Sequence, residues 1–425
     1  MINEESIRAV RTSRLNSHFG KPLYDGYGFA ALPGTIQTML TGHLSPHRLP
    51  SPALGLFPPH YEKVIVLFID AFGWRFVERF YKKYPFLQRI AQEGVISVLS
   101  TQFPSTTSAH VTTFHTGKPV GETGIYEWFI YEPTLDAMII PLMYSYAGDE
   151  IPETLRKSPA NPKTIYPRQN VYSDLAARGV KSYLFQPHNI IHSTYTETLS
   201  QGASLIGYRT LSEGLVNLAE LALRVKGKAL FYWYYDAIDS ICHRYGPDSP
   251  HVAAEIDTCM NALERLFHAA VAGKLKNTAV MLIADHGQTE VNPETTVYLN
   301  QALPALVPLI RQGQRGDLLT PAGSSRDMFL HVLPNAVDEA QTMLTRRLEG
   351  YAEVYRTNTL IEQGFFGETI SDSFRARIAD LVVLPYQGNT VWWYEKGIYE
   401  MRFLGMHGGL GAEEMETNLL FYPYI

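Results

Sequence analysis

The sequence has few cysteines, no excess of basic residues and no long apolar run. Cys242 and Cys259 are its only cysteines, and they form neither a CxxC pair nor a disulfide framework. Lysine and arginine number 36 against 42 aspartates and glutamates, so the chain lacks the positive potential that binds nucleic-acid polymers or anionic lipid. No run reaches about 18 apolar residues, and the N-terminus lacks the apolar segment of a secretory signal. We therefore expect a cytoplasmic protein without a membrane or nucleic-acid partner.

Hydrophobic residues make up 45% of the 425 residues, enough for a large buried core. Short apolar runs alternate with helical patterns, which occur at 76–94, 170–179 and 211–225 and in a long helix opened by Ser249 and Pro250. The apolar runs lie at 64–69, 95–99, 181–185, 229–235 and 278–284. This alternation predicts an α/β fold with a doubly wound, mainly parallel sheet sandwiched by helices.

The remaining segments contain more turn-forming residues. Residues 1–60 are rich in glycine, proline and histidine, and we expect an irregular N-terminal leader packed on the core. Residues 61–425 are expected to form one large domain. Within it, residues 125–180 and 290–400 are less regular and are expected to be insertions that cap the carboxyl edge of the sheet.

Two of the predicted strands end at residues that could hold a metal ion. Asp70 follows the run at 64–69, and Asp285 and His286 follow the run at 278–284. The carboxyl ends of parallel strands are where open α/β sheets place their sites. Asp70 alone is more typical of a helix N-cap or a turn than of a ligand, whereas the adjacent Asp285 and His286 form the most specific pattern.

Three further candidates lie in two other parts of the chain. Asp239 and His243 follow the run at 229–235, and their four-residue spacing places both on one face of a helical turn. The alternative for this pair is an ordinary surface contact. His407 lies between small residues in the motif GMHGG, which permits close approach to a ligand. Three carboxylates and three imidazoles are the ligand set of a two-metal hydrolytic centre.

A cluster of hydroxyl groups at 103–117, FPSTTSAHVTTFHTG, lies at a predicted strand-to-helix turn. Such a cluster often caps a helix, with serine or threonine meeting free backbone N–H groups. It also supplies the hydroxyl nucleophile that a two-metal centre needs.

Five motifs, read in order, are similar to those of one enzyme family. They are VLFIDAFG, FPSTTSAHVTTFHTG, YDAIDSICHRYGP, LIADHGQ and GMHGG, spread over about residues 61–425. The sequence resembles the alkaline phosphatase superfamily, and within it the type I phosphodiesterase/nucleotide pyrophosphatase family. The resemblance implies an alkaline phosphatase-like fold and a metal-dependent phosphoric ester hydrolase.

The resemblance also implies a role for each candidate residue. Thr107 matches the family's nucleophile, and Thr106 is the neighbouring candidate if the turn is shifted by one residue. Thr107 also matches a ligand of the first metal, which it shares with Asp70, Asp285 and His286. The second metal has the ligands Asp239, His243 and His407. We expect two divalent cations, with zinc as the first choice and manganese as the alternative.

The sequence departs from the usual diesterases around the nucleophile. It lacks the lysine before the nucleophile and the asparagine that helps hold the phosphoryl oxygens, and it has no CxPxR signature of sulfatases. We expect cleavage of phosphodiester or pyrophosphate bonds in a small nucleotide-like substrate through a phosphothreonine intermediate. The alternatives are a phosphomonoesterase or phosphomutase on the same centre and a non-catalytic binding protein.

Other polar and aromatic residues are assigned structural roles instead. Histidines of the predicted helix after Thr107, on a helix face or in the core, are expected to form hydrogen bonds rather than bind metal. Arg326 is expected in a surface ion pair rather than on a substrate phosphate. Aromatic runs at 232–235 and 391–394 are expected to pack in the core rather than stack on a nucleobase. The residues set aside in this way are His110, His115, His188, His192, Asp236 and Arg326.

Overall fold

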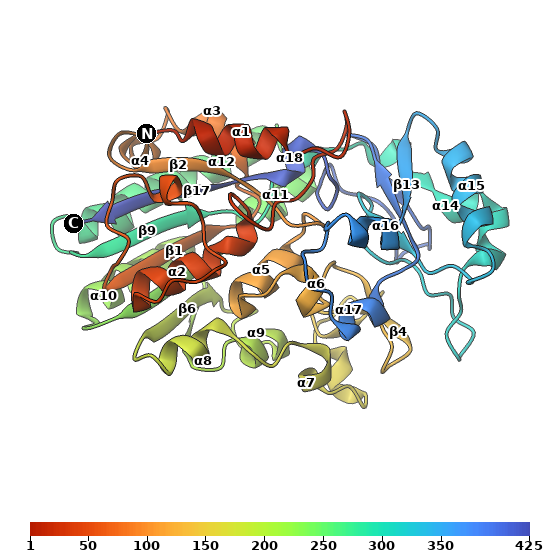
Figure 1. The fold of residues 1–425 in the computed structure, drawn as a ribbon, viewed down its shortest axis with the longest axis horizontal. Helices are drawn as coiled ribbons and strands as arrows, with labels where there is room; N and C mark the ends of the chain where they lie inside the picture. The colour runs from red at the N-terminus through yellow and green to blue at the C-terminus, as the bar shows by residue number, and fades with distance from the viewer.

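The computed structural model describes residues 1–425 and contains a central seven-stranded sheet. Its strand order is β2-β17-β9-β1-β8-β6-β7 (Figure 1). Only β17 runs antiparallel to its neighbours, so the sheet is mainly parallel, as predicted. The strands are β1 (Lys63–Ile69), β2 (Val95–Ser100), β6 (Lys181–Pro187), β7 (Ala203–Tyr208), β8 (Ala229–Tyr235), β9 (Thr278–Ile283) and β17 (Glu416–Tyr424).

Helices cover both faces of this sheet, which confirms the predicted α/β sandwich. One face carries α3 (Trp74–Phe80), α4 (Pro85–Glu93), α10 (Leu211–Arg224) and α12 (Pro250–Ala262). The other carries α2 (Leu32–Thr41), α5 (Thr107–Thr116) and α8 (Val171–Ala176). The strands β1, β2, β8 and β9 are buried along their whole length, because helices remove both faces from water.

The predicted helix boundaries are correct where a capping signal is present. The Ser249 side chain accepts a hydrogen bond from the Val252 N–H, and Pro250 is the first residue of α12. The helix continues through a π-helical turn (Leu263–His268) into α13 (Ala269–Val271). The single pattern at 76–94 is instead two helices, because Pro85 holds Tyr84 in an extended conformation and begins α4.

The first 60 residues contain more regular structure than the irregular leader that we expected. Asn3 caps α1 (Glu4–Thr12), and α2 ends at Gly42, whose φ of 79° suits glycine. The two 3-10 turns are Phe29–Ala31 and Ser51–Leu54. The segment packs on the core through buried side chains such as Phe29 and Ile36, and this burial stabilises helices that are too short to persist alone.

A second, smaller layer lies beyond the carboxyl edge of the large sheet (Figure 1, right). The antiparallel sheet β12-β14-β13 and helix α15 enclose an apolar core of their own. The elements of this layer fall within the 290–400 range. They are β11 (Val297–Tyr298), α14 (Leu299–Ala302), β12 (Met328–Leu330), α15 (Val337–Arg347), β13 (Ala352–Arg356), α16 (Thr357–Glu362), β14 (Leu381–Pro385) and β15 (Val391–Trp392). Helix α17 (Asp372–Arg377), from the same range, packs instead on α6 (Val120–Thr123) and β3 (Ile130–Glu132).

The 125–180 range forms a small antiparallel sheet, β3-β4-β5, followed by short helices. These elements are β3 (Ile130–Glu132), β4 (Ala137–Ile140), β5 (Ser145–Tyr146) and α7 (Pro162–Ile165). The other short elements are α6 (Val120–Thr123), α9 (Thr194–Leu199), α11 (Ala237–Tyr245), β10 (Thr289–Glu290), β16 (Gly405–Met406) and α18 (Ala412–Met415). The extents of the leader, the domain and its insertions stay predictions.

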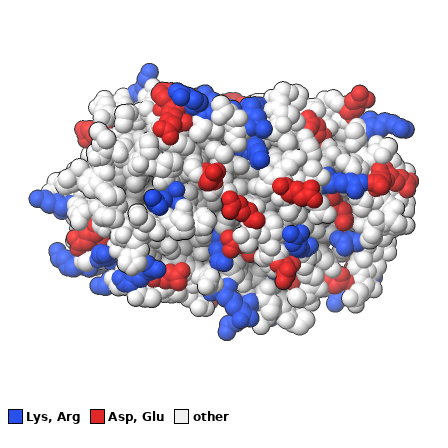
Figure 2. All heavy atoms as spheres, in the orientation of Figure 1, with Lys and Arg blue, Asp and Glu red and all other residues white.

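The charges on the surface and the state of the cysteines agree with what the composition predicts. Basic and acidic side chains are mixed over the face shown in Figure 2. Both cysteines are buried free thiols. None of the helices combines the length and the hydropathy that a membrane crossing needs.

Candidate metal centre

The candidate ligands meet at the carboxyl ends of three adjacent strands. Asp70 follows β1 directly, and Asp285 and His286 follow β9. Helix α11 begins two residues after β8 and carries Asp239 in its first turn. Because β9, β1 and β8 are neighbours in the sheet, these side chains converge although they are far apart in the sequence.

Asp70, Asp285 and His286 form the first ligand group, which is buried. Their exposed fractions are 2%, 0% and 0%. His286 Nε2 lies 3.5 Å from Asp70 Oδ1 and 3.4 Å from Asp285 Oδ2. These two carboxylate oxygens are buried and have no hydrogen-bond partner. Such orphaned oxygens are costly unless something else neutralises them, and a cation would do so.

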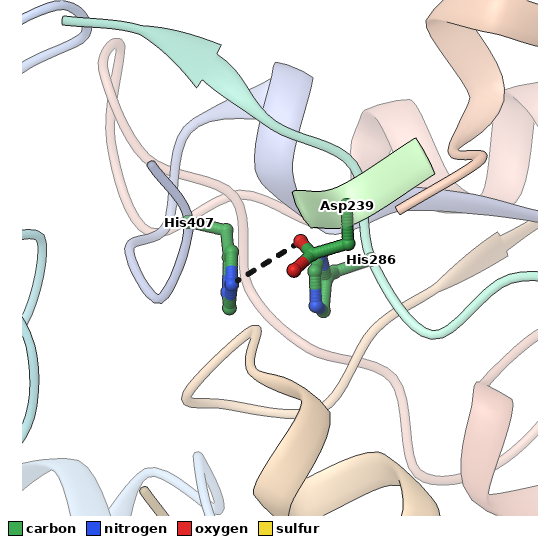
Figure 3. Close-up of side chains that lie close together, drawn as sticks. All are labelled: Asp239, His286 and His407. Atoms are coloured by element: carbon green, nitrogen blue, oxygen red, sulfur yellow. Dashed lines mark ion pairs between the residues drawn. The ribbon is translucent and has the colours of Figure 1, made fainter. Parts of the chain in front are cut away.

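Asp239, His243 and His407 form the second ligand group, which is more open. Asp239 Oδ2 lies 3.4 Å from His243 Nε2, and Asp239 Oδ1 lies 3.7 Å from His407 Nε2. Figure 3 shows Asp239 and His407 pointing toward each other, with His286 beside them. The His286 and His407 rings stack with centroids 3.7 Å apart, so the two groups are adjacent.

Backbone carbonyl groups fix the orientation of all three imidazoles. In each case Nδ1 contacts a carbonyl oxygen, which leaves Nε2 directed into the site. This arrangement holds the ring and its tautomer in the form that binds a metal. The contacts are His243 with Gly405 at 2.7 Å, His286 with Gly287 at 3.0 Å and His407 with Ser105 at 3.0 Å.

The structure places Thr107 beside the first group. Thr107 is the first residue of α5, and its hydroxyl lies 3.0 Å from His286 Nε2. Thr106 is the N-cap residue and is buried, and its side chain instead contacts Glu127. Of the two candidates, the geometry therefore favours Thr107 as the hydroxyl that faces the ligands.

The spacing of these atoms fits divalent cations. Ligand atoms about 2.0–2.2 Å from a tetrahedral ion lie about 3.3–3.6 Å from one another. The observed separations within the two groups, 3.4–3.7 Å, are close to this value. Mixed oxygen and nitrogen donors suit zinc or manganese. The residues present can therefore hold two divalent cations, with His286 close to both groups.

The electrostatics differ between the two groups. Burial and the charge of Asp285 raise the pKa of Asp70 well above its ordinary value. Burial also raises the pKa of Asp239, but the attraction of His243 and His407 outweighs it and holds that pKa below its usual range. Burial lowers the pKa of His407, which favours the neutral imidazole that binds metals.

Sequence reasoning missed two residues that support the ligands. The Tyr234 hydroxyl donates a hydrogen bond to Asp70 Oδ2, and the Gln288 amide donates to Asp239 Oδ1 at 2.5 Å. Gln288 follows the Asp285 motif directly, and Tyr234 lies near the end of β8. Both residues lie close in sequence to predicted ligands or strand ends, which could have marked them as candidates. Which ligand each one contacts depends on the fold and could not be predicted.

The histidines of α5 form hydrogen bonds within the fold, as predicted. His110 Nε2 accepts a hydrogen bond from the Gln102 N–H at 2.8 Å, and its Nδ1 contacts the Thr106 carbonyl oxygen. His115 Nδ1 contacts the Tyr172 hydroxyl at 2.6 Å. Both rings are thus used within the fold.

The other residues set aside also lie outside the two ligand groups. Arg326 is in an ion pair, but a fully buried one with Glu414 rather than the surface pair expected, so its guanidinium is not free for a phosphate. His192 is exposed beside Glu197. Neither ligand group includes Asp236 or His188. The aromatic run 232–235 is the buried strand β8, as predicted.

The sequence matches one known protein family. The model of the type I phosphodiesterase/nucleotide pyrophosphatase family matches residues 64–410. No sequence match is found among curated proteins.

Several solved structures share the fold. Murine ectonucleotide pyrophosphatase/phosphodiesterase 5 has a TM-score of 0.63 at 16% identity, covering 85% of this chain and 88% of that chain. An inactive threonine-to-alanine variant of it, in complex with AMP, has the same TM-score and identity and covers 86% of this chain and 88% of that chain. The human protein has a TM-score of 0.63 at 17% identity, with coverages of 85% and 88%.

The family match includes all the predicted ligands, and the fold agrees with these structures. The chain belongs to the type I phosphodiesterase/nucleotide pyrophosphatase family and is a phosphoric ester hydrolase.

Proposed function

We propose that the protein is a two-metal hydrolase that cleaves phosphodiester or pyrophosphate bonds of a small nucleotide-like substrate through a phosphothreonine intermediate on Thr107. The observation that carries this proposal is the position of the Thr107 hydroxyl, 3.0 Å from His286 Nε2 and beside two ligand groups. The murine structural neighbour is made inactive by a threonine-to-alanine change and binds AMP, which supports a threonine nucleophile and a nucleotide substrate.

The chain's residues would hold the two cations in separate places. Asp70, Asp285, His286 and Thr107 would bind the first, and Asp239, His243 and His407 the second. Divalent cations, when bound, favour the ionised forms of hydroxyl groups and stabilise negative charge on phosphate oxygens. We propose zinc, because the two groups together contain three imidazoles and three carboxylates, a mixed donor set that suits this metal.

The reaction itself then involves one protein nucleophile. Thr107 Oγ1 attacks phosphorus, a bond from oxygen to phosphorus forms, and the bond from phosphorus to the leaving oxygen breaks. The retained part of a diester stays esterified to Thr107. Water then cleaves the bond between Thr107 Oγ1 and phosphorus and restores the hydroxyl. The carbonyl contacts of the three imidazoles keep the ligands in place during both steps.

The first experiment compares hydrolysis of a p-nitrophenyl phosphodiester and the corresponding monoester by zinc-loaded and manganese-loaded protein. We expect a large preference for the diester, which is lost after chelation and in Thr107→Ala. Mass spectrometry after rapid acid quenching should find the retained group on Thr107 in the native protein alone.

Other outcomes would direct the assignment elsewhere. A preference for the monoester would favour the phosphomonoesterase or phosphomutase alternative on the same centre. Tight metal binding without turnover of either ester would favour the binding protein. Full activity in Thr107→Ala would contradict the nucleophile assignment. The cytoplasmic location stays a proposal, which fractionation of the producing cells would test.

A further inference from the structure

Glu127 and Asp327 form a pair of carboxyl groups behind the metal centre that the proposed reaction does not use. Both side chains have exposed fractions of 0%, and one carboxyl oxygen of each lies beside the Gly408 backbone, so the two groups are neighbours. Glu127 Oε1 and Asp327 Oδ2 are buried without a hydrogen-bond partner. Two carboxyl groups buried side by side cannot both stay ionised unless a cation lies between them, and without a cation one of them keeps a proton.

No basic side chain neutralises this pair. Arg326 is adjacent in sequence, but its guanidinium donates to Glu414 and to two backbone carbonyl oxygens. The Glu414 carboxylate adds to the negative potential at Asp327. Tyr126, which also packs near Asp327, contributes only a neutral phenol. The groups that face the pair therefore leave its negative charge uncompensated.

The pair is packed too tightly against the backbone for a hydrated cation. A Cβ atom at Gly408 would lie 2.6 Å from Ser324 Oγ, 2.7 Å from Asp327 Oδ1 and 3.2 Å from Glu127 Oε1. The three oxygens thus converge on the Gly408 backbone itself, beside His407. A shared proton needs no such space, and burial raises the pKa of Glu127 to about 7.

The pair connects the two turns that carry functional residues. On one side Glu127 contacts the side chain of Thr106, which precedes the nucleophile. On the other side Asp327 accepts hydrogen bonds from the Ser324 N–H and hydroxyl, and the Ser324 hydroxyl also lies 3.2 Å from the His407 carbonyl oxygen.

The same two turns also touch directly. Ser105 and Gly408 form an antiparallel bridge, and the Ser105 hydroxyl donates to the Gly409 carbonyl oxygen at 2.7 Å. The Ser105 N–H donates to the Gly408 carbonyl oxygen at 3.2 Å. The carboxyl pair therefore supports this junction from behind.

We propose that Glu127 and Asp327 share one proton and act as positioning residues, which hold the turn of Thr107 and the turn of His407 at a fixed separation. The pair carries a single negative charge and one internal hydrogen bond. This inference rests on the proposed function for its catalytic consequence. Its structural consequence, the position of His407 relative to Asp239, does not depend on any substrate.

The test uses variants that keep or remove the bridge. Glu127→Gln keeps the shape and the net charge of the singly protonated pair, because the amide is neutral, and its N–H can donate to the Asp327 carboxylate. Glu127→Ala removes the contact, and Asp327→Asn is the matched exchange on the other side. Each variant is loaded with zinc, and its fold is checked by circular dichroism.

Three readouts are measured. Glu127→Ala should lower kcat for the p-nitrophenyl diester by about 10–100-fold with little change in KM, because an outer contact to a ligand turn is lost. It should also weaken the binding of one of the two zinc ions by a similar factor. Both amide variants should stay within about 3-fold of the native protein in kcat and in zinc binding. The infrared band of a protonated carboxyl group, present in the zinc-loaded native protein, should disappear in both amide variants.

The outcomes separate the possibilities. Three divalent ions per native chain, reduced to two in Glu127→Gln, would replace the shared proton with a cation and overturn the proposal. Equal damage by Glu127→Gln and Glu127→Ala would overturn it as well. If Glu127→Ala does not fold, the infrared band and metal count of the amide variants still decide. If the native protein cleaves no ester, the proposed function fails, while zinc binding and the infrared band still test the bridge.

Discussion

The two ligand groups differ in how the fold holds them. Asp70, Asp285 and His286 are buried at the ends of β1 and β9, whereas the side chains of Asp239 and His243, on the short helix α11, are 16% and 18% exposed. The group at the strand ends cannot move without disturbing the sheet. The more open group is partly accessible to solvent. We therefore expect changes in the buried group to affect metal retention and folding, and changes beside the open group to affect substrate choice.

The largest expected effect comes from the hydroxyl next to the buried group. Thr107→Ala should lower kcat/KM for the p-nitrophenyl diester by about 10⁴-fold or more, since the nucleophile is lost. Zinc content should stay near the native value, because the carboxylates and imidazoles remain. Thr107→Ser is the matched control and should retain measurable turnover. Loss of both metals in Thr107→Ala would show that the hydroxyl holds the centre together.

A pair of isosteric changes tests the contrast between the groups directly. Asp285→Asn and Asp239→Asn each remove one ligand charge, and each should lower kcat by about 10²–10³-fold because metal stabilisation of the transition state is weakened. We expect only Asp239→Asn to recover activity at high zinc concentration, since its open group can rebind the ion. Zinc titrations followed by activity measure this difference. Equal recovery of both variants would contradict the predicted difference in zinc rebinding between the buried group and the open group.

The buried group should also limit the stability of the metal-free protein. The pKa of Asp70 is raised in the fold, so above the ordinary aspartate pKa the folded state binds more protons than the unfolded state. Stability of the chelated protein should therefore fall as pH rises from about 4 toward the raised pKa. The depressed pKa of Asp239 acts only at lower pH, where stability is lost on acidification.

Asp70→Asn should remove the loss of stability that the ionised Asp70 side chain causes in the chelated protein. At pH 7 the chelated variant should be more stable than the chelated native protein by about 1–2 kcal/mol, although it binds metal poorly. Thermal melts across the pH range, with and without zinc, measure both effects. A variant that is less stable than the native protein at every pH would show that Asp70 contributes more by its hydrogen bond from Tyr234 than it costs by its charge.

The contrast also explains what the sequence could predict. Asp70 and Asp285 directly follow apolar strands, and Asp239 and His243 have helical spacing, so local patterns together with the family motifs identified them. The carboxyl pair behind His407 could not be found in this way, because its members come from segments about 200 residues apart. Strand β17 was missed for a similar reason, since its place between β2 and β9 is set by tertiary pairing.

The smallest expected effect lies at the open group and concerns substrate choice. Phe403 is 47% exposed, and its ring centroid lies 4.9 Å from that of His243. The Leu404 N–H donates to the His243 carbonyl oxygen at 2.8 Å, which fixes this aromatic ring beside the second ligand group. Phe403→Ala should raise KM for an aryl leaving group about 3–10-fold through lost ring contact, with kcat unchanged. An alkyl leaving group should show no change.

The matched control is Ile398→Ala, which removes a similarly exposed apolar side chain (48%) from the same loop segment. If Phe403→Ala raises KM for aryl and alkyl leaving groups equally, the ring acts on the retained part of the substrate. If it lowers kcat alone, the ring supports His243 rather than the substrate. Only the aryl-specific change in KM assigns the open group to leaving-group choice and leaves the buried group to nucleophile and metal.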